Sequence, residues 1–303
     1  PPFFGIRIKP LSDQSFDRAI KTLDLFINTL AGQVKSFPQQ FVVTLPKVSE
    51  IKQVLALTGN LSRLEQAAGL KPGTIGIELM VELPQAIFDA SGRPLLPTLF
   101  RATGNRCRAV HFGAFDFTAE LGISGVFQDI NHPACDLARY LARFSLASFN
   151  VRFSDSVTTV LPVEIHRRND LNDHQRAENR QKIFNAWQVH FRNIQRAISA
   201  GIYQSWDLHP NQLPARYAAV YSYYLSNADV QASRLKSFLS TAARASLSGN
   251  VFDDAASARG VIAFFRRGLD CGAFDAKEIK NLTGLSVKQL RLGFEELLRQ
   301  LSR

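Results

Sequence analysis

Two acidic residues stand at the ends of apolar segments, where a carboxylate is costly unless something pairs with it. Glu82 follows the run IGIELMV, and Asp116 follows RAVHFGAF about one strand–helix unit later. Acids at the ends of neighbouring strands can share a hard divalent cation, Mg²⁺ or Mn²⁺, and leave positions open for water and substrate oxygens. Such a cation polarises a carbonyl group or stabilises an enolate. In the alternative interpretation, each acid caps a helix or pairs with one of the many arginines.

Other polar residues lie in the same apolar segments and are expected near this pair. Arg7 stands between two isoleucines in FGIRI, so the strand alternation turns its side chain to the opposite face. In a closed barrel that face is the interior mouth, and the alternative interpretation is a surface arginine. Glu78 lies four residues before Glu82 and points the same way, and we expect Lys47 on the adjacent strand to neutralise it, as support behind the metal. His111 is expected to be either a satisfied core histidine or a proton carrier.

Strand-like and helix-like segments alternate up to about residue 214, and this pattern favours parallel βαβ units. We expect strands over residues 4–8, 41–46, 75–83, 107–117, 151–163 and 202–206. No GxGxxG or GxxxxGK[ST] motif is present, which favours a TIM (β/α)8-type barrel over an open nucleotide-binding sheet. A barrel needs eight strands, so we expect two to be missing at the front of this chain. Residues 215–303 are expected to form a helical C-terminal extension.

The overall composition excludes several classes of protein. The chain has 303 residues, 46% of them hydrophobic, which suits a globular protein with a sizeable core. Its formal charge of +10 is spread along the chain, so we interpret it as a solvated surface and expect no nucleic-acid partner. No window is apolar enough for a membrane helix, and PPFFGIRIKP lacks a signal-peptide pattern. Three scattered cysteines form no metal or disulfide framework, which favours a cytoplasmic location.

Five segments resemble the motifs of one superfamily, in the same order. MVELPQAI (80–87) followed by FGAFDFTAELG (112–122) resembles the paired metal-ligand motifs of the citrate lyase beta-subunit and HpcH/HpaI aldolase superfamily, a phosphoenolpyruvate/pyruvate-type TIM barrel. GIRIKP (5–10) and LPKVSE (45–50) are similar to its third and fourth barrel strands, and SWDLHPNQLPARYAA (205–219) resembles its closing strand. The resemblance implies that residues 1–214 hold barrel units three to eight.

The resemblance also implies roles for individual residues. Glu82 and Asp116 would bind the metal, Mg²⁺ or Mn²⁺, and Arg7 would bind the carboxylate or carbonyl oxygen of the substrate. His209 and Gln212 match the end of the closing strand and are expected to contact the substrate or orient the last loop. Asp155 is the only nearby candidate for the catalytic acid of strand seven. Glu82 is followed by Leu83 rather than by the hydroxyl residue usual in the superfamily, which removes a polar group near the metal.

The implied activity is that of a metal-dependent carbon–carbon lyase or aldolase. It would act on a 2-oxo acid or hydroxy acid, with or without a thioester, and stabilise the enolate formed during cleavage. A condensing enzyme that resembles malate synthase is the nearest alternative, and a non-catalytic binding protein on a barrel scaffold is the alternative from another class. Because the superfamily is usually oligomeric, we expect a homo-oligomer, a trimer or hexamer assembled through residues 214–303.

Overall fold

The computed structural model describes residues 4–248 and 255–301 of the chain. It divides into two compact units. The first comprises Pro1–Val189 and Arg196–Pro210, and the second comprises His190–Gln195 and Asn211–Arg303. The strands of the described residues belong to the first unit.

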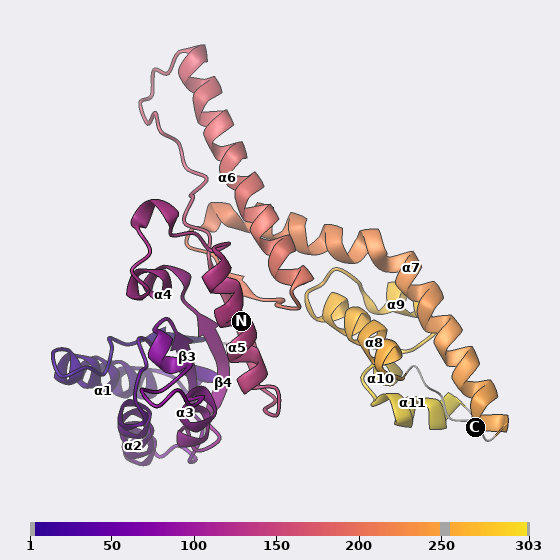
Figure 1. Ribbon diagram of the computed structural model, residues 1–303, viewed down its shortest axis with the longest axis horizontal. Coiled ribbons are helices and arrows are strands. Elements are labelled where there is room, and N and C mark those ends of the chain that lie inside the picture. The colour runs from indigo at the N-terminus through magenta and orange to yellow at the C-terminus, as the bar shows by residue number, and fades with distance from the viewer. Residues whose placement is uncertain (1–3, 249–254, 302–303) are drawn as a thin grey trace. The chain divides into compact units, whose positions relative to one another are not determined.

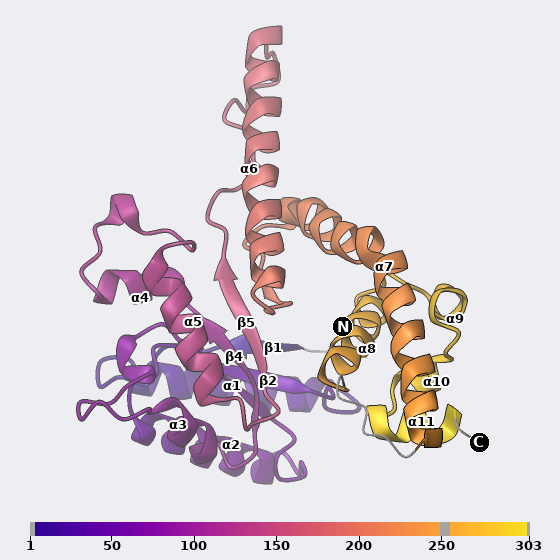
Figure 2. The same cartoon turned by 45° about the vertical axis from the view of Figure 1, so that its right-hand side comes forward.

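The described residues of the first unit contain a sheet of six parallel strands, arranged in space in the order of the chain. They are β1 (Phe4–Arg7), β2 (Phe41–Leu45), β3 (Gly76–Val81), β4 (Cys107–Phe112), β5 (Arg152–Val157) and β6 (Ser205–Trp206). The sheet curls into a half-barrel, as Figure 2 shows for β1, β2, β4 and β5. The expected alternation of strands and helices in an α/β fold is therefore confirmed.

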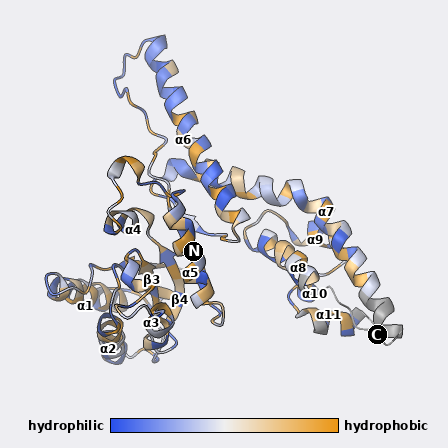
Figure 3. Cartoon of the chain, in the orientation of Figure 1, coloured by the Kyte–Doolittle hydropathy of each residue, from blue (hydrophilic) through white to orange (hydrophobic). Residues whose placement is uncertain are grey.

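Helices join successive strands, because parallel neighbours require a crossover connection. They are α1 (Phe16–Gln33), α2 (Ile51–Ala67), α3 (Leu96–Ala102), the short α4 (Ala114–Glu120), α5 (Pro133–Ser145) and α6 (Asp173–Ser199). Helices α1, α2, α3 and α5 cover one face of the sheet (Figure 1). Figure 3 shows apolar residues on these helices and mainly hydrophilic residues along the N-terminal part of α6.

The two faces of the sheet differ because side chains alternate along each strand. On β2, Val43 and Leu45 point toward the helices and are fully buried, and Leu79 of β3 does the same. Burial of each such side chain stabilises the fold by roughly 1.5–3 kcal/mol. The alternate residues Thr44 and Glu78 point to the other face, where they bond to each other. The inner face of the half-barrel therefore carries polar side chains, among them the Thr44–Glu78 pair.

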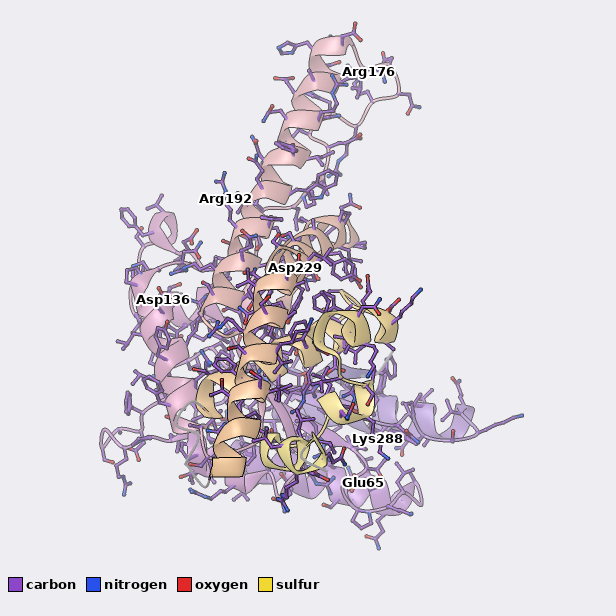
Figure 4. All side chains as sticks on the ribbon, turned by 90° about the vertical axis from the view of Figure 1, so that its right-hand side faces the viewer. Glu65, Asp136, Arg176, Arg192, Asp229 and Lys288 are labelled. Carbon is purple, nitrogen blue, oxygen red and sulfur yellow. The ribbon has the colours of Figure 1, made fainter. Side chains whose placement is uncertain are left out.

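The C-terminal end of α6 is held against α5 by ionic and polar contacts within the first unit. Asp136 of α5, labelled in Figure 4, forms an ion pair with Arg196 of α6. Arg143 of α5 donates to the carbonyl of Ala200, directly after α6. The N-terminal end of α6 is closed by a capping box between Asn172 and Gln175. None of the described helices is long and apolar enough to span a membrane.

The second unit has a hydrophobic core of its own. Over residues 213–248 and 255–301 it contains helices and no strand. These are α7 (Leu213–Ser248), α8 (Ala255–Asp270), α9 (Ala276–Thr283), α10 (Val287–Leu290) and α11 (Phe294–Leu301). Phe265, Leu235 and Leu297 lie fully buried at the centre of this core.

Candidate active site

A cavity of about 160 Å³ lies beyond the carboxyl ends of the strands. Its walls include Arg7 at the end of β1, Glu82 just after β3, Asp116 of α4, Ser156 of β5 and Trp206 of β6. Ligands of parallel α/β sheets bind at this edge, because the loops that follow the strands converge there. The cavity has room for a small molecule of a few carbon atoms.

Glu82 carries a buried carboxylate on the wall of this cavity. Its side chain is only 2% exposed, and the backbone N–H of Lys47 donates to Oε1 at 2.7 Å. The Arg7 guanidinium lies 3.9 Å from the same oxygen. Burial raises the pKa of Glu82, and the charge of Asp116 raises it further, against the opposing effects of Lys47 and Arg7. Because burial disfavours the ionised form of Glu82, an additional positive charge beside it would stabilise that form.

Lys47 adopts an unusual backbone conformation that brings its N–H to Glu82. Its φ is +49°, in the left-handed region that a residue with a Cβ seldom occupies. Strained backbone of this kind concentrates at functional sites, where surrounding contacts hold it in place. The turn also directs the Lys47 side chain toward α4.

Asp116 does not close the fourth strand, contrary to the prediction from the sequence. Strand β4 ends at Phe112, Gly113 occupies the N-cap position of α4, and Asp116 lies in the first turn of that helix. The positive end of the helix dipole favours an acid in this position. The structure nevertheless brings Asp116 and Glu82 to the same cavity, and Lys47 bonds to both, through its backbone N–H to Glu82 and through its side chain to Asp116. Lys47 Nζ donates to Asp116 Oδ1 at 2.8 Å.

Gly113 is required because the Glu82 side chain packs directly on its backbone. A Cβ at position 113 would lie 2.5 Å from Glu82 Cβ and 2.9 Å from Glu82 Oε2. Real Cβ atoms do not approach so closely, and Glu82 is enclosed on its other sides. Any side chain at position 113 therefore displaces the carboxylate.

Gly113→Ala is expected to destabilise the protein by about 1–3 kcal/mol, as overpacking of a buried position does. Gly59→Ala on α2 is the matched control, because nothing lies within 4 Å of the added Cβ. That control should be neutral or slightly stabilising, since Ala is favoured over Gly inside a helix by about 0.5–1 kcal/mol. Urea unfolding of both variants measures the difference, and an equal effect at the two positions would contradict the packing described here.

His111 and Glu78 form a pair beneath the cavity, and this corrects the predicted pairing of Glu78 with Lys47. Trp206 Nε1 donates to His111 Nδ1 at 2.8 Å, so Nδ1 is an acceptor and Nε2 carries the ring proton. His111 Nε2 lies 2.9 Å from Glu78 Oε2, to which it donates. Thr44 Oγ1 donates to the same oxygen at 3.2 Å. Both ring nitrogens are therefore used, and His111 has the contacts of a satisfied core histidine.

Glu78→Gln is expected to lower stability at neutral pH. Burial disfavours the charged form of Glu78, but donation from His111 and Thr44 outweighs it and lowers the pKa of Glu78. An acid whose pKa is lowered by folding contributes stability above its unfolded pKa of about 4.3 and loses it as the pH falls through the folded value. The difference between wild type and variant should thus shrink below about pH 4.

Urea unfolding from pH 7 down to pH 3 measures this difference. Asp24→Asn is the control, because Asp24 pairs with the exposed Arg63 at the surface and such pairs contribute about 0–1 kcal/mol. A difference between wild type and Glu78→Gln that stays constant over this range would contradict the ionised pairing.

Trp206 links this inner pair to the mouth of the cavity. Its ring centroid lies 6.0 Å from the guanidinium carbon of Arg7, within the range of a cation–π contact. The side chain of Arg7 is 46% exposed and lines the cavity. Sequence analysis identifies neither Trp206 nor Ser156. The sequence indicates only that Ser156 and Trp206 lie in the last two expected strands, 151–163 and 202–206.

The structure does not bring Asp155 to the cavity, although the sequence predicts a catalytic role for it. Its Oδ1 accepts from Arg139 Nε at 2.7 Å and from the N–H of Ser156 at 2.8 Å. The strand alternation explains this placement, because Asp155 points toward α5 while Ser156 lines the cavity. Asp155 thus anchors α5 to the sheet.

The two residues expected from the closing strand lie just after β6. His209 is partly buried and follows Leu208, which lines the cavity. Gln212 is fully buried in the short 3-10 helix η3 (Pro210–Gln212) and belongs to the second unit.

The donor atoms at the cavity suit a hard divalent cation. Glu82 and Asp116 supply carboxylate oxygens, and the structure contains no group of three or more His, Cys, Asp or Glu side chains arranged to hold a metal within its described residues. Mg²⁺ is commonly bound by one or two carboxylates with water and substrate oxygens in its other positions. The pair therefore fits Mg²⁺ or Mn²⁺ and lacks the nitrogen and sulfur ligands of a structural zinc site.

Two solved structures align with this chain. A citrate lyase from Burkholderia xenovorans aligns with a TM-score of 0.56 and 18% identity over 92% of this chain and 76% of the other. A malate synthase from Haloferax volcanii, in complex with pyruvate and acetyl-CoA, aligns with a TM-score of 0.49 and 13% identity over 71% of this chain and 50% of the other. The first alignment shows that the chain shares its fold with this citrate lyase. No curated protein matches the sequence significantly.

A family model also matches almost the whole sequence. It covers residues 1–296 and is described as "Domain of unknown function (DUF6986)". The chain belongs to the DUF6986 family.

Proposed function

We propose that this protein is a divalent-cation-dependent carbon–carbon lyase or aldolase that acts on a 2-oxo acid or hydroxy acid. One observation carries the proposal: Glu82 and Asp116 line one small cavity together with Arg7, and Lys47 bonds to both acids. The likeness in fold to a citrate lyase supports an enzyme of this general kind. We infer further that the curled sheet represents units three to eight of a TIM-type barrel, with residues 215–303 as a helical extension.

Glu82 and Asp116 would hold Mg²⁺ or Mn²⁺ through their carboxylate oxygens. When bound, the cation would polarise the oxo group of the substrate and stabilise the negative charge that develops on it as the carbon–carbon bond breaks. Burial of Glu82 keeps this acid in one position, and the N–H of Lys47 fixes the orientation of its Oε1. Glu82 is thus held in place before the substrate arrives, which lowers the reorganisation needed during reaction.

Arg7 would bind the carboxylate of the substrate. A guanidinium presents two parallel N–H donors to a carboxylate, and such a pair is both stronger and more directional than a neutral hydrogen bond. The ring of Trp206 lies beside the guanidinium and limits its movement. Trp206 is in turn oriented by its bond to His111, so the Glu78–His111–Trp206 chain positions Arg7 without touching the substrate.

Ser156 is a further candidate for substrate contact. Its Oγ accepts the N–H of Ala114 at 3.1 Å, so its own hydroxyl proton is available to donate toward the cavity. This N–H lies at the start of α4, the helix that carries Asp116. His209 and Gln212 stay predictions as substrate contacts, as does the trimeric or hexameric assembly.

A panel of 4-hydroxy-2-oxo acids and malate-like compounds tests this function. The full chain is incubated with Mg²⁺ or Mn²⁺, and release of pyruvate or glyoxylate is followed with a coupled dehydrogenase. We expect release by the wild type and none above background by Glu82→Gln. Equal release by both proteins would contradict a role for the carboxylate pair. Failure of the wild type across the panel, in both the cleavage and the condensing direction, would favour the non-catalytic binding protein.

A further inference from the structure

The Lys47 ammonium lies against the carboxylate pair that the proposed function assigns to a divalent cation. Its Nζ is 2.8 Å from Asp116 Oδ1, a distance typical of a charge-assisted hydrogen bond. The negative charges of Glu82 and Glu120 also act on this ammonium group. A cation supplied by the chain itself therefore already neutralises one of the two candidate ligands.

The charges of the two ion pairs at the cavity, Arg7–Glu82 and Lys47–Asp116, balance without any metal. With every group ionised, the negative charges of Glu82 and Asp116 are matched by the positive charges of Arg7 and Lys47. A divalent cation placed between the two acids would lie close to two positive side chains and give the site an excess positive charge. Charges a few ångströms apart in a partly buried site interact strongly. An anionic substrate would restore the balance.

We propose that Lys47 is a built-in counter-cation that makes binding of the divalent cation depend on the substrate anion. This inference rests on the proposed function of the site. Without substrate, Lys47 competes with the metal for Asp116 and keeps its affinity low. When a 2-oxo acid arrives, its negative charge offsets the excess, so metal and substrate each strengthen the binding of the other by the same factor.

The local structure allows the ammonium to move without disturbing Glu82. The bond to Glu82 comes from the backbone N–H of Lys47, whereas the bond to Asp116 comes from its side chain. Both the Lys47 and the Asp116 side chains are 42% exposed, so each has solvent on one side. Lysine carries its charge on a flexible stem of four carbons. A change of the side chain alone therefore removes the counter-cation and leaves the backbone contact in place.

Mn²⁺ binding to the full chain tests this directly, with unbound Mn²⁺ measured by electron paramagnetic resonance in the presence and absence of oxalate. A protein-free titration corrects for Mn²⁺–oxalate in solution. For the wild type we expect weak binding of Mn²⁺ alone and binding about tenfold or more tighter with oxalate, a coupling of ordinary size. For Lys47→Met we expect Mn²⁺ alone to bind about tenfold more tightly and the oxalate enhancement to fall to about threefold or less.

Two further variants separate charge from structure. Lys52→Met removes the same charge from an exposed lysine that pairs with Glu50, and it should behave as the wild type. Lys47→Arg keeps the charge and should keep both the weak binding and the enhancement. Equal affinity and enhancement in the wild type and Lys47→Met would overturn the counter-cation role while leaving the metal site intact, and so would Lys47→Arg behaving as Lys47→Met. Absence of Mn²⁺ binding in every folded protein, with or without oxalate, would overturn the proposed function itself.

Discussion

Glu82→Gln is expected to weaken Mn²⁺ binding by about a hundredfold or more, because it would remove one of the two proposed carboxylate ligands, which no other acid of the cavity can replace. Carbon–carbon cleavage should fall to background for the same reason. Glu120→Gln is the matched control, since Glu120 is an exposed acid on α4 whose charge also acts on Lys47. It should change Mn²⁺ affinity by no more than about threefold. Calorimetric titration in the presence of oxalate measures both, and equal losses would show that the effect is one of general charge.

The same substitution is expected to stabilise the metal-free protein at neutral pH. Burial raises the pKa of Glu82 above its unfolded value. The protonated acid therefore contributes its full share of the folding free energy below about pH 4.3, and this contribution is lost as the pH rises through the folded pKa. Glutamine has no charged form and avoids this loss. Thermal unfolding should therefore show a higher melting temperature for Glu82→Gln near pH 7–8, with the difference shrinking at acidic pH.

Arg7→Met is expected to raise the dissociation constant for oxalate in the presence of Mn²⁺ by about a hundredfold, the size expected when charge-assisted hydrogen bonds are lost. Arg7→Lys should recover only part of this loss, because a point charge cannot donate two parallel bonds or stack on Trp206 as a guanidinium does. Arg93→Met is the control, since Arg93 is 80% exposed and pairs with Asp89 at the surface. Calorimetry provides the measurement, and oxalate binding unchanged in Arg7→Met would remove Arg7 from the site.

The sheet can be predicted from the sequence because its signals are local. The runs FVVTL and GIELMV are apolar and rich in β-branched or large side chains, and each is followed by a helix-forming segment. The proximity of Glu82 to the α4 region follows from topology, because the carboxyl ends of neighbouring parallel strands meet at one edge. The secondary structure around Asp116 is harder to predict, since FGAFDF is apolar apart from Asp116 itself and a short run of this kind suits a strand or a helix.

The contacts of the inner face could not be predicted because they depend on where the backbone turns. A lysine with a positive φ has no signature in the sequence, yet this conformation directs the Lys47 side chain to Asp116. Glu78 therefore bonds to His111 and not to Lys47. The exclusion of Asp155 depends on the register of β5, in which Ser156 points to the cavity. A shift of one residue in register exchanges the two faces of a strand.

Anomalous diffraction from crystals of the full chain grown with Mn²⁺ and oxalate tests the central claim most directly. We predict one strong manganese peak at the carboxyl end of the sheet, about 2.0–2.2 Å from a carboxylate oxygen of Glu82 and one of Asp116, with oxalate completing the coordination. Arg7 should then contact oxalate, and Lys47 Nζ should have left the bonding position that it holds at Asp116. A cavity without manganese, or manganese bound elsewhere while Lys47 stays on Asp116, would contradict the account.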